Sequence, residues 1–237
     1  DLVVKAPSIV EFKIPARLAS GRTLVVSGVL DPQAGQDGTV RLEAGLSRVE
    51  PSAIGATSPI VAGGRVFVCT VRWPDSVQER TKVIPEHHVL CYSASNGQRL
   101  WDAKVAPGPW LRTDYRSGPG GGYAAPMPTS DGKLVYVMFG SSVIAALDFD
   151  GRAVWRKEIT PYTFDVTVGS SPVLYHDSLL VLCAMANKTD SKLVAYDKAD
   201  GSIRWTTSLP ETGFGHSTPV LITAGGRDQL IVVASGI

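Results

Sequence analysis

The sequence predicts an all-β protein made of repeated antiparallel sheets. Its 237 residues include 24 glycines and 16 prolines, which suit short strands separated by turns better than helices. No stretch longer than a turn or two shows helical periodicity. Hydrophobic residues make up 44% of the chain and charged residues 19%, so the chain can bury a sizeable core.

Charge and hydropathy exclude some classes of partner. The 23 basic and 22 acidic residues nearly cancel, so we expect neither nucleic acid nor an anionic membrane as the main partner. No apolar run reaches the roughly 18 residues of a membrane helix, and no membrane span is expected. The chain begins at Asp1 and carries no signal peptide. We expect that preceding residues were removed, so the missing signal does not indicate a cytosolic protein.

One hairpin pattern occurs three times, in residues 91–101 (CYSASNGQRLW), 146–155 (ALDFDGRAVW) and 195–205 (AYDKADGSIRW). Each copy has a short apolar strand, a turn with Asn-Gly or Asp-Gly, and a strand that ends on tryptophan. These dipeptides favour tight hairpin turns because both residues tolerate positive φ. The equivalent glycines and tryptophans are Gly97, Gly151, Gly201, Trp101, Trp155 and Trp205.

A strand pair precedes each hairpin, beginning near Ser58, Ala125 and Ser170, and a fourth pair begins at Ser217. Each pair has an early proline, a polar turn and a strongly β-forming second strand. Four strands in roughly 40–50 residues are the pattern of a β-propeller blade. We therefore predict an incomplete β-propeller of three four-stranded blades and a truncated fourth, at about 56–106, 123–160, 168–210 and 216–237. An insertion from Trp73 to His87 separates two strands of the first blade.

Residues 1–46 do not follow the repeat. Two strands are expected at 24–30 and 39–46, on either side of a polar turn. They form the end of a preceding β-sandwich-like domain or a cap on the propeller. Residues 47–55 are expected to be a linker, and residues 56–237 the propeller.

The repeat Ala-x-Asp-x-x-Asp/Asn-Gly-x-x-x-Trp resembles that of pyrroloquinoline-quinone-like (PQQ-like) β-propellers, over about residues 56–237. This group includes quinoprotein alcohol dehydrogenases and the propeller lipoprotein of the outer-membrane assembly machinery. The resemblance implies that each repeated tryptophan docks on the neighbouring blade, and that the protein is exported to the periplasm or cell exterior. A large aromatic residue at a fixed strand position also favours inter-blade packing on physical grounds. Because a partial ring has open sheet edges, self-association through blade edges is a further expectation.

The resemblance allows an enzyme or a scaffold. Quinoprotein dehydrogenases carry adjacent cysteines above the quinone, a metal-binding Glu/Asn pair and a catalytic Asp. Here the cysteines are separated, no acidic/Asn cluster matches the metal site, and Asp165 is a single carboxylate. The favoured expectation is a non-catalytic module with no catalytic residue, cofactor or metal. The alternatives are a fragment of a PQQ- and calcium-dependent alcohol or sugar dehydrogenase, and a structural domain attached to an enzyme in the parent chain.

Other candidate motifs have simpler explanations. The cysteines lie where the repeat accepts small apolar residues, which favours core packing over redox or metal chemistry, and an odd number leaves at least one free thiol: Cys69, Cys91 and Cys183. The run at 118–122 (GPGGG) lacks a following Lys-Ser/Thr or helix, which favours a loop over a phosphate site. His87 and His88 are adjacent, so in a strand they point to opposite faces and cannot readily chelate one ion.

The loops that enter the first strand of each blade are the predicted site, because in propellers they gather at one mouth of the channel and loops carry function more often than strands. They span residues 112–123, 162–168 and 212–216. Aromatic side chains with a few charges suit a protein, peptide or glycan ligand. The other interpretation is that these side chains only order the loops. The candidate ligand-binding residues are Tyr115, Arg116, Tyr123, Asp165, Phe214 and His216.

Overall fold

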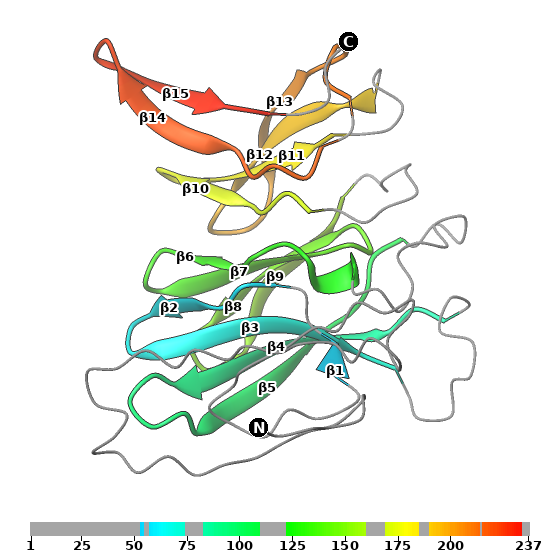
Figure 1. Cartoon of the computed structure of the whole chain (residues 1–237), viewed down its shortest axis with the longest axis vertical. Coiled ribbons are helices and arrows are strands. Elements are labelled where there is room, and N and C mark those ends of the chain that lie inside the picture. The colour runs from blue at the N-terminus through cyan, green and yellow to red at the C-terminus, as the bar shows by residue number, and fades with distance from the viewer. Residues whose placement is uncertain are drawn as a thin grey trace, which may run out of the picture. The chain divides into compact units, whose positions relative to one another are not determined.

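The computed structural model describes residues 53–54, 57–73, 83–109, 122–159, 169–184, 190–213 and 215–233. The chain divides into two compact units, residues 1–50 and 51–237, and every described residue belongs to the second. The strands expected at 24–30 and 39–46 lie outside the described residues. Figure 1 shows that the second unit is a series of twisted antiparallel sheets.

Blade 1 is a sheet in which β3 pairs with β2, β4 and a short β1, and β4 pairs in turn with β5. β1 lies inside the segment predicted as a linker. β4 begins at Glu86, so the predicted insertion after Trp73 ends before it and His87 belongs to the strand. The strands are β1 (Ala53–Ile54), β2 (Ile60–Ala62), β3 (Arg65–Arg72), β4 (Glu86–Ser93) and β5 (Arg99–Val105).

Blades 2 and 3 are four-stranded meanders, and a two-stranded hairpin follows them. Blade 2 contains β6 (Thr129–Ser130), β7 (Leu134–Phe139), β8 (Val143–Asp148) and β9 (Ala153–Glu158), preceded by the short 3₁₀ helix η3 (Gly122–Ala124). Blade 3 contains β10 (Val173–Tyr175), β11 (Ser178–Cys183), β12 (Lys192–Asp197) and β13 (Ile203–Ser208). The hairpin, here called the half-blade, consists of β14 (Val220–Ala224) and β15 (Arg227–Ile231).

These sheets confirm the predicted fold class, an all-β incomplete propeller of three four-stranded blades and a truncated fourth. Within the described part of the chain, no helix is both long and apolar enough to cross a membrane.

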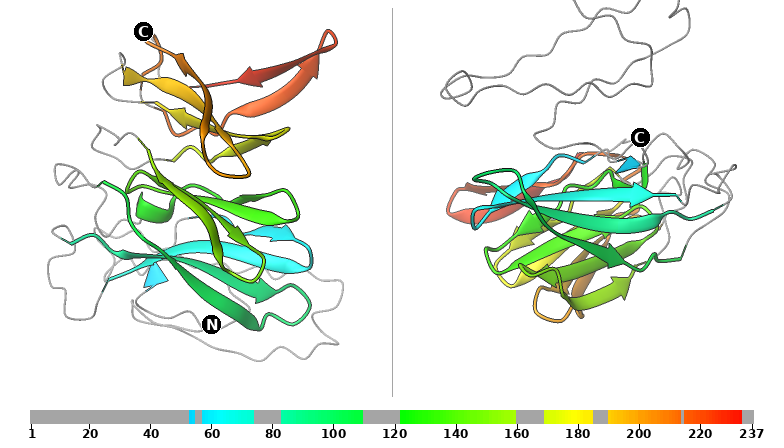
Figure 2. Two further views of the ribbon diagram at one scale, coloured as in Figure 1. Left: turned by 180° about the vertical axis from the view of Figure 1, so that it is seen from behind. Right: turned by 90° about the horizontal axis from the view of Figure 1, so that it is seen from below.

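The blades pack face to face (Figure 2), and their cores lie between successive sheets. Phe67 and Val89 of blade 1 meet Val137 and Phe139 of blade 2, all fully buried. The opposite face of blade 2 meets blade 3 through a second buried cluster that includes Tyr136 and Leu179. Because side chains alternate along a strand, each middle blade buries both of its faces.

A tryptophan joins each blade to the next. The Trp101 Nε1–H donates to the carbonyl of Phe149 at 2.7 Å, and the Trp155 Nε1–H donates to that of Lys198 at 2.9 Å. Each indole ring lies against a turn glycine, so closely that a Cβ would come within 2.9 Å of Trp101 at Gly151 and 2.7 Å of Trp155 at Gly201. Both glycines have positive φ, 84° and 71°, and so does Gly97, at 72°. A turn glycine therefore serves both the hairpin and the inter-blade contact.

The three cysteines are free and buried. Strand register places Cys69 and Cys183 one residue out of step, because Phe67 and Leu180 oppose the equivalent residues Cys91 and Ala195. Cys69 therefore packs between blades 1 and 2, whereas Cys183 packs between blades 2 and 3.

The antiparallel order gives the blades two distinct ends. The turn end carries the tight turns β2–β3, β4–β5, β10–β11 and β14–β15, which lie on the left of Figure 1. The loop end carries the β3–β4, β7–β8 and β11–β12 connections together with the connections between blades.

Candidate functional site

The first strands of the blades are joined at the loop end by hydrogen bonds between consecutive blades. The Thr57 hydroxyl donates to the carbonyl of Pro126 at 3.0 Å. The Met127 N–H donates to Ser171 Oγ at 2.9 Å, and the Ser171 N–H donates to Thr218 Oγ1 at 3.0 Å. We call this series the inner rim; it comprises residues 57–58, 126–127, 170–171 and 216–218.

Prolines explain the rim's local conformation. Ser58, Met127, Ser171 and Thr218 each precede a proline. A residue before proline is confined to extended backbone, which keeps the chain from turning before the strand begins. The β6 and β10 strands that follow are in contact, so the rim lies where neighbouring blades approach each other.

The rim exposes a mixed set of side chains. Met127 is 38% exposed, although its backbone N–H is bound to the next blade. His216, a predicted site residue, is also exposed. Its ring lies directly on the backbone of Gly169, where a Cβ would come within 2.4 Å of His216 Nδ1. His216 thus connects the approach to the half-blade with the approach to blade 3.

Tyr123, another predicted site residue, is buried rather than displayed. It is 1% exposed, and its ring centroid lies 6.2 Å from that of Trp73 and 5.9 Å from that of His87. Its carbonyl accepts the Gly140 N–H at 2.7 Å. Tyr123 therefore packs at the junction of blades 1 and 2, away from His216, and its role toward a ligand stays a prediction. The other four predicted residues lie outside the described residues: Tyr115, Arg116, Asp165 and Phe214.

The same junction contains a buried histidine. His87 Nε2 lies 2.7 Å from Ser141 Oγ, which also accepts the Gly108 N–H at 3.2 Å. The His87 ring packs on Phe139, with centroids 4.6 Å apart. Burial lowers the pKa of His87 to about 4, so the imidazole is neutral at pH 7. The contact ties the β7–β8 connection to blade 1.

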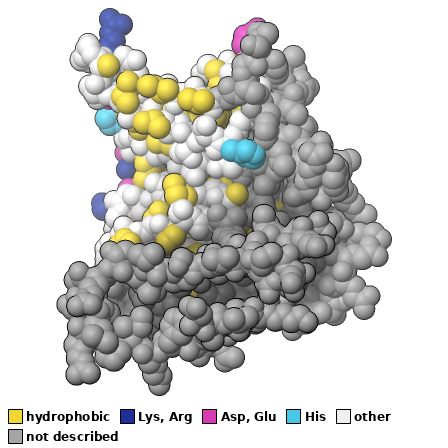
Figure 3. All heavy atoms as spheres, in the orientation of Figure 1, with side chains coloured by type: hydrophobic (Ala, Val, Ile, Leu, Met, Phe, Trp, Pro, Cys, Tyr) yellow, Lys and Arg dark blue, Asp and Glu magenta, His cyan; other side chains and the backbone are white. Residues whose placement is uncertain are grey.

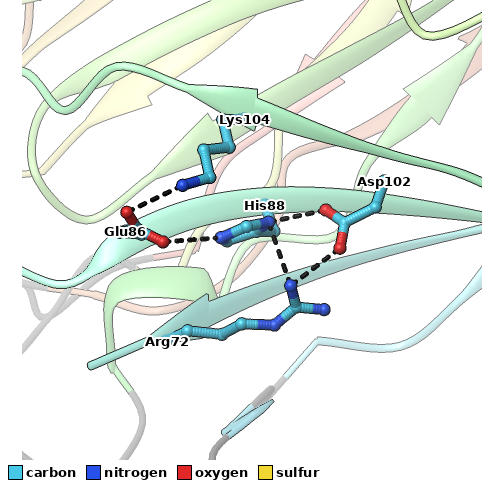
Figure 4. A network of polar contacts seen from close by, with 5 residues as sticks. All are labelled: Arg72, Glu86, His88, Asp102 and Lys104. Atoms are coloured by element: carbon cyan, nitrogen blue, oxygen red, sulfur yellow. Dashed lines mark hydrogen bonds and ion pairs between the residues drawn. The ribbon is translucent and has the colours of Figure 1, made fainter. Parts of the chain in front are cut away.

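A polar network on the other face of blade 1 went unrecognised in the sequence (Figure 4). His88 Nδ1 lies 2.6 Å from Asp102 Oδ1, and Arg72 donates to Asp102 Oδ2 at 2.7 Å. Lys104 donates to Glu86 Oε1 at 2.8 Å, and His88 Nε2 lies 3.4 Å from the second Glu86 oxygen. We call these five residues the polar ladder. Their signal is alternation, since each of three adjacent strands contributes polar residues two apart.

The polar ladder is self-neutralising. Burial raises the pKa of Asp102, but the hydrogen bonds from His88 and Arg72 outweigh it and hold this pKa below its usual value. The bond from Lys104 likewise lowers the pKa of the exposed Glu86 carboxyl. Both carboxylates are thus ionised and matched by cations. The chemistry of this arrangement favours cross-strand pairing over proton transfer.

The tryptophan docks, the turn glycines and the repeated sheets define a PQQ-like repeat β-propeller. A family model described as outer membrane protein assembly factor BamB matches residues 44–236, and the chain belongs to this family.

Similar solved structures include enzymes and a family member. The europium-containing methanol dehydrogenase is 16% identical, with a TM-score of 0.48, over 69% of this chain and 26% of its own. The quinohemoprotein alcohol dehydrogenase from Comamonas testosteroni is 18% identical, with a TM-score of 0.45, over 65% and 21%. BamB from Moraxella catarrhalis is 15% identical, with a TM-score of 0.43, over 73% and 59%. The chain thus spans less than two thirds of each, and no curated protein matches it.

The cofactor of the dehydrogenases can be compared with the residues present. In the described ranges, no group of three or more His, Cys, Asp or Glu side chains is arranged to hold a metal ion. The two carboxylates of the polar ladder are already bound to Arg72, His88 and Lys104. The described residues therefore do not fit a quinone–calcium site, and no reaction step is assigned to them.

Proposed function

We propose that this propeller is a non-catalytic binding module of an exported protein, and that it recognises a protein partner through the inner rim and the adjoining loops. The observation that carries the proposal is the series of inter-blade hydrogen bonds from Thr57 to Thr218, which leaves Met127 and His216 exposed. The family description, an assembly factor of outer membrane proteins, supports a partner that is itself a protein and a location outside the cytoplasm.

The rim has the physical properties of a preorganised contact surface. Its backbone is fixed by bonds between blades, so little conformational entropy remains to be lost on binding. Met127 supplies a flexible apolar side chain that adapts to different contours. His216 adds a polar group that can donate or accept a hydrogen bond.

The loops beside the rim are anchored to the blades. Arg156 of β9 donates through Nε to the carbonyl of Ala106 at 2.8 Å, and its second guanidinium nitrogen donates to Pro107. The Gly108 N–H that follows is bound to Ser141. The start of the connection between blades 1 and 2 is thus held by blade 2, as a loop that presents a binding surface requires.

Site-specific photo-crosslinking in the native host tests the proposal. A photoreactive amino acid is placed at His216 or Met127, and at Lys133 in the β6–β7 turn as the control. We expect the two rim positions to yield the same crosslinked protein, identified by mass spectrometry, and Lys133 to yield none. Equal crosslinking at Lys133, or none at either rim position, would contradict the proposal.

Substitution complements crosslinking. Met127→Ala combined with His216→Ala should weaken capture of that crosslinked protein without changing the thermal stability of the chain, because both side chains are exposed. Tyr123→Ala is unsuitable, since removing a buried aromatic ring destabilises the junction of blades 1 and 2.

The alternative, a PQQ-dependent oxidoreductase, has its own test. PQQ and calcium are added to the protein, and quinone absorbance and dye-linked oxidation of alcohols and sugars are measured. Stoichiometric quinone binding with turnover would replace the binding-module proposal.

A further inference from the structure

Trp205 lacks the dock that the other repeated tryptophans have. Trp155 is 8% exposed, whereas Trp205 is 43% exposed. Trp101 and Trp155 each donate to a carbonyl in the next blade. No described residue accepts a hydrogen bond from the indole of Trp205, and no described glycine turn lies against it.

The half-blade next to Trp205 has a free edge. β15 pairs with β14 alone, whereas β3, β7 and β11 each have a third strand beside them. The β14–β15 turn is closed by Ala224 opposite Arg227 across two glycines of positive φ. Since antiparallel pairs alternate between bonded and non-bonded, Asp228 and Leu230 direct their backbone N–H and C=O groups toward the free edge.

Apolar side chains surround this edge. Ile203 on β13 is 63% exposed, and on the half-blade Val220 and Ile231 are 57% and 44% exposed. In Figure 3 hydrophobic side chains gather over β14 and β15. The half-blade already covers the β11 side of blade 3, where Leu180 and Leu182 are buried. The β13 side of blade 3 is the part left open.

We propose that the β15 edge and Trp205 form a docking site for a β-hairpin with a glycine in its turn, donated by another polypeptide. The first strand of this hairpin pairs with β15, and its turn lies on the Trp205 ring and accepts the indole N–H. The site continues an interface that the molecule builds twice. In both filled docks the turn supplies the acceptor carbonyl shortly before a glycine of positive φ, as Lys198 and Gly201 do for Trp155.

A second copy of this chain fits the site poorly. Pairing β15 with β15 of a second copy requires a two-fold axis normal to the sheet, because the strands must run antiparallel. Both copies of blade 3 would then lie on the same face of the joined sheet. The second copy would occupy the space beside β13, where the first copy already has Ile203 and Trp205.

A synthetic hairpin tests the docking site. The probe is a dye-labelled peptide of residues 192–208, the β12–β13 hairpin of the chain itself, with W205F and cyclised head to tail because isolated hairpins are marginally stable. It is titrated into the full chain, and fluorescence anisotropy reports binding. We expect saturable binding that Trp205→Ala weakens at least roughly tenfold, as truncation of a central aromatic anchor does. Thr206→Ala, on the opposite face of β13, is the matched control and should leave binding unchanged.

Two further measurements identify the contact. A probe with Gly201→Ala should lose binding, because at the Trp155 dock the added methyl would lie 2.7 Å from the ring. Hydrogen exchange should slow at the amides of Asp228 and Leu230 when the probe binds. Absence of saturable binding, equal binding to Trp205→Ala, or unchanged exchange at these amides would overturn the proposal. Sedimentation of the chain alone as a dimer that Trp205→Ala dissolves would overturn it in favour of a second copy.

Discussion

Two glycines of blade 2 provide a direct test of the tryptophan docks. Gly132 and Gly151 have nearly the same backbone conformation, with φ of 86° and 84°. A Cβ at Gly132 would meet nothing within 4 Å, whereas a Cβ at Gly151 would lie 2.9 Å from Cδ2 of Trp101. Gly132→Ala therefore measures the backbone term, and Gly151→Ala measures that term plus the contact with the indole ring.

The two substitutions should differ clearly in cost. Placing an L-residue at positive φ costs about 1–2 kcal/mol, and both variants incur this. Forcing a methyl group into a close contact adds about 1–3 kcal/mol at Gly151. Changes in the unfolded chain are similar for two Gly→Ala substitutions and cancel in the comparison. We expect a loss of about 1–2 kcal/mol for Gly132→Ala and about 2–5 kcal/mol for Gly151→Ala, the sums of these two terms.

Urea unfolding, followed by circular dichroism, measures both free energies. Trp101→Ala gives the third corner of a double-mutant cycle. In that background Gly151→Ala should cost about as much as Gly132→Ala, because the ring is gone, which leaves a coupling of about 1–3 kcal/mol. Equal costs for the two glycine variants in the parent chain, or no coupling in the cycle, would refute a rigid dock between Trp101 and Gly151.

Three further predictions concern titratable groups. The pKa of His87 is lowered to about 4 from 6.5, so between these pH values the unfolded chain binds a proton that the folded chain does not. Stability from this difference is fully present above pH 6.5 and falls by up to about 3 kcal/mol as the pH approaches 4; His87→Gln should flatten the dependence in urea unfolding from pH 7 to 4.5. Asp102→Asn should lower the unfolding free energy by about 1–2 kcal/mol at pH 7, since it removes the acceptor of two charge-assisted bonds, whereas Glu86→Gln should change it little because that carboxylate is exposed. Thiol reagents should modify none of the cysteines in the folded chain and all of them in urea, because the folded chain buries Cys69, Cys91 and Cys183; prompt labelling without denaturant would contradict that burial.

The fold was predictable because its determinants are local. A turn dipeptide and a tryptophan lie a few residues apart, and each copy carries both, so the pattern is visible without knowing any contact. The docking partners follow from the same pattern, since Trp101 meets the turn of the next copy at Gly151. The start of β4 was missed because the insertion after Trp73 has no counterpart in the other copies to align with.

The site was less predictable because its contacts depend on strand register. His88 and Asp102 are 14 residues apart, and Arg72 is a further 16 residues before His88, so their meeting depends on two separate pairings. A one-residue slip would move every one of these side chains to the opposite face. The same sensitivity explains why Cys69 and Cys183 were aligned although they lie in different cores. Burial of Tyr123 beside Trp73 also depends on η3, whose position no repeat indicates.

Register also shows that the two limits of the blade series differ chemically. Thr70 and His88 of blade 1 occupy the positions at which blade 2 places Phe139 and Val143 against its predecessor. The back face of blade 1 therefore carries matched charges, while the front of blade 3 presents Trp205 and apolar side chains. An apolar face gains nothing by meeting charged groups that must lose water to make the contact. The series thus cannot extend head to tail through identical interfaces, and each limit selects a partner of its own kind.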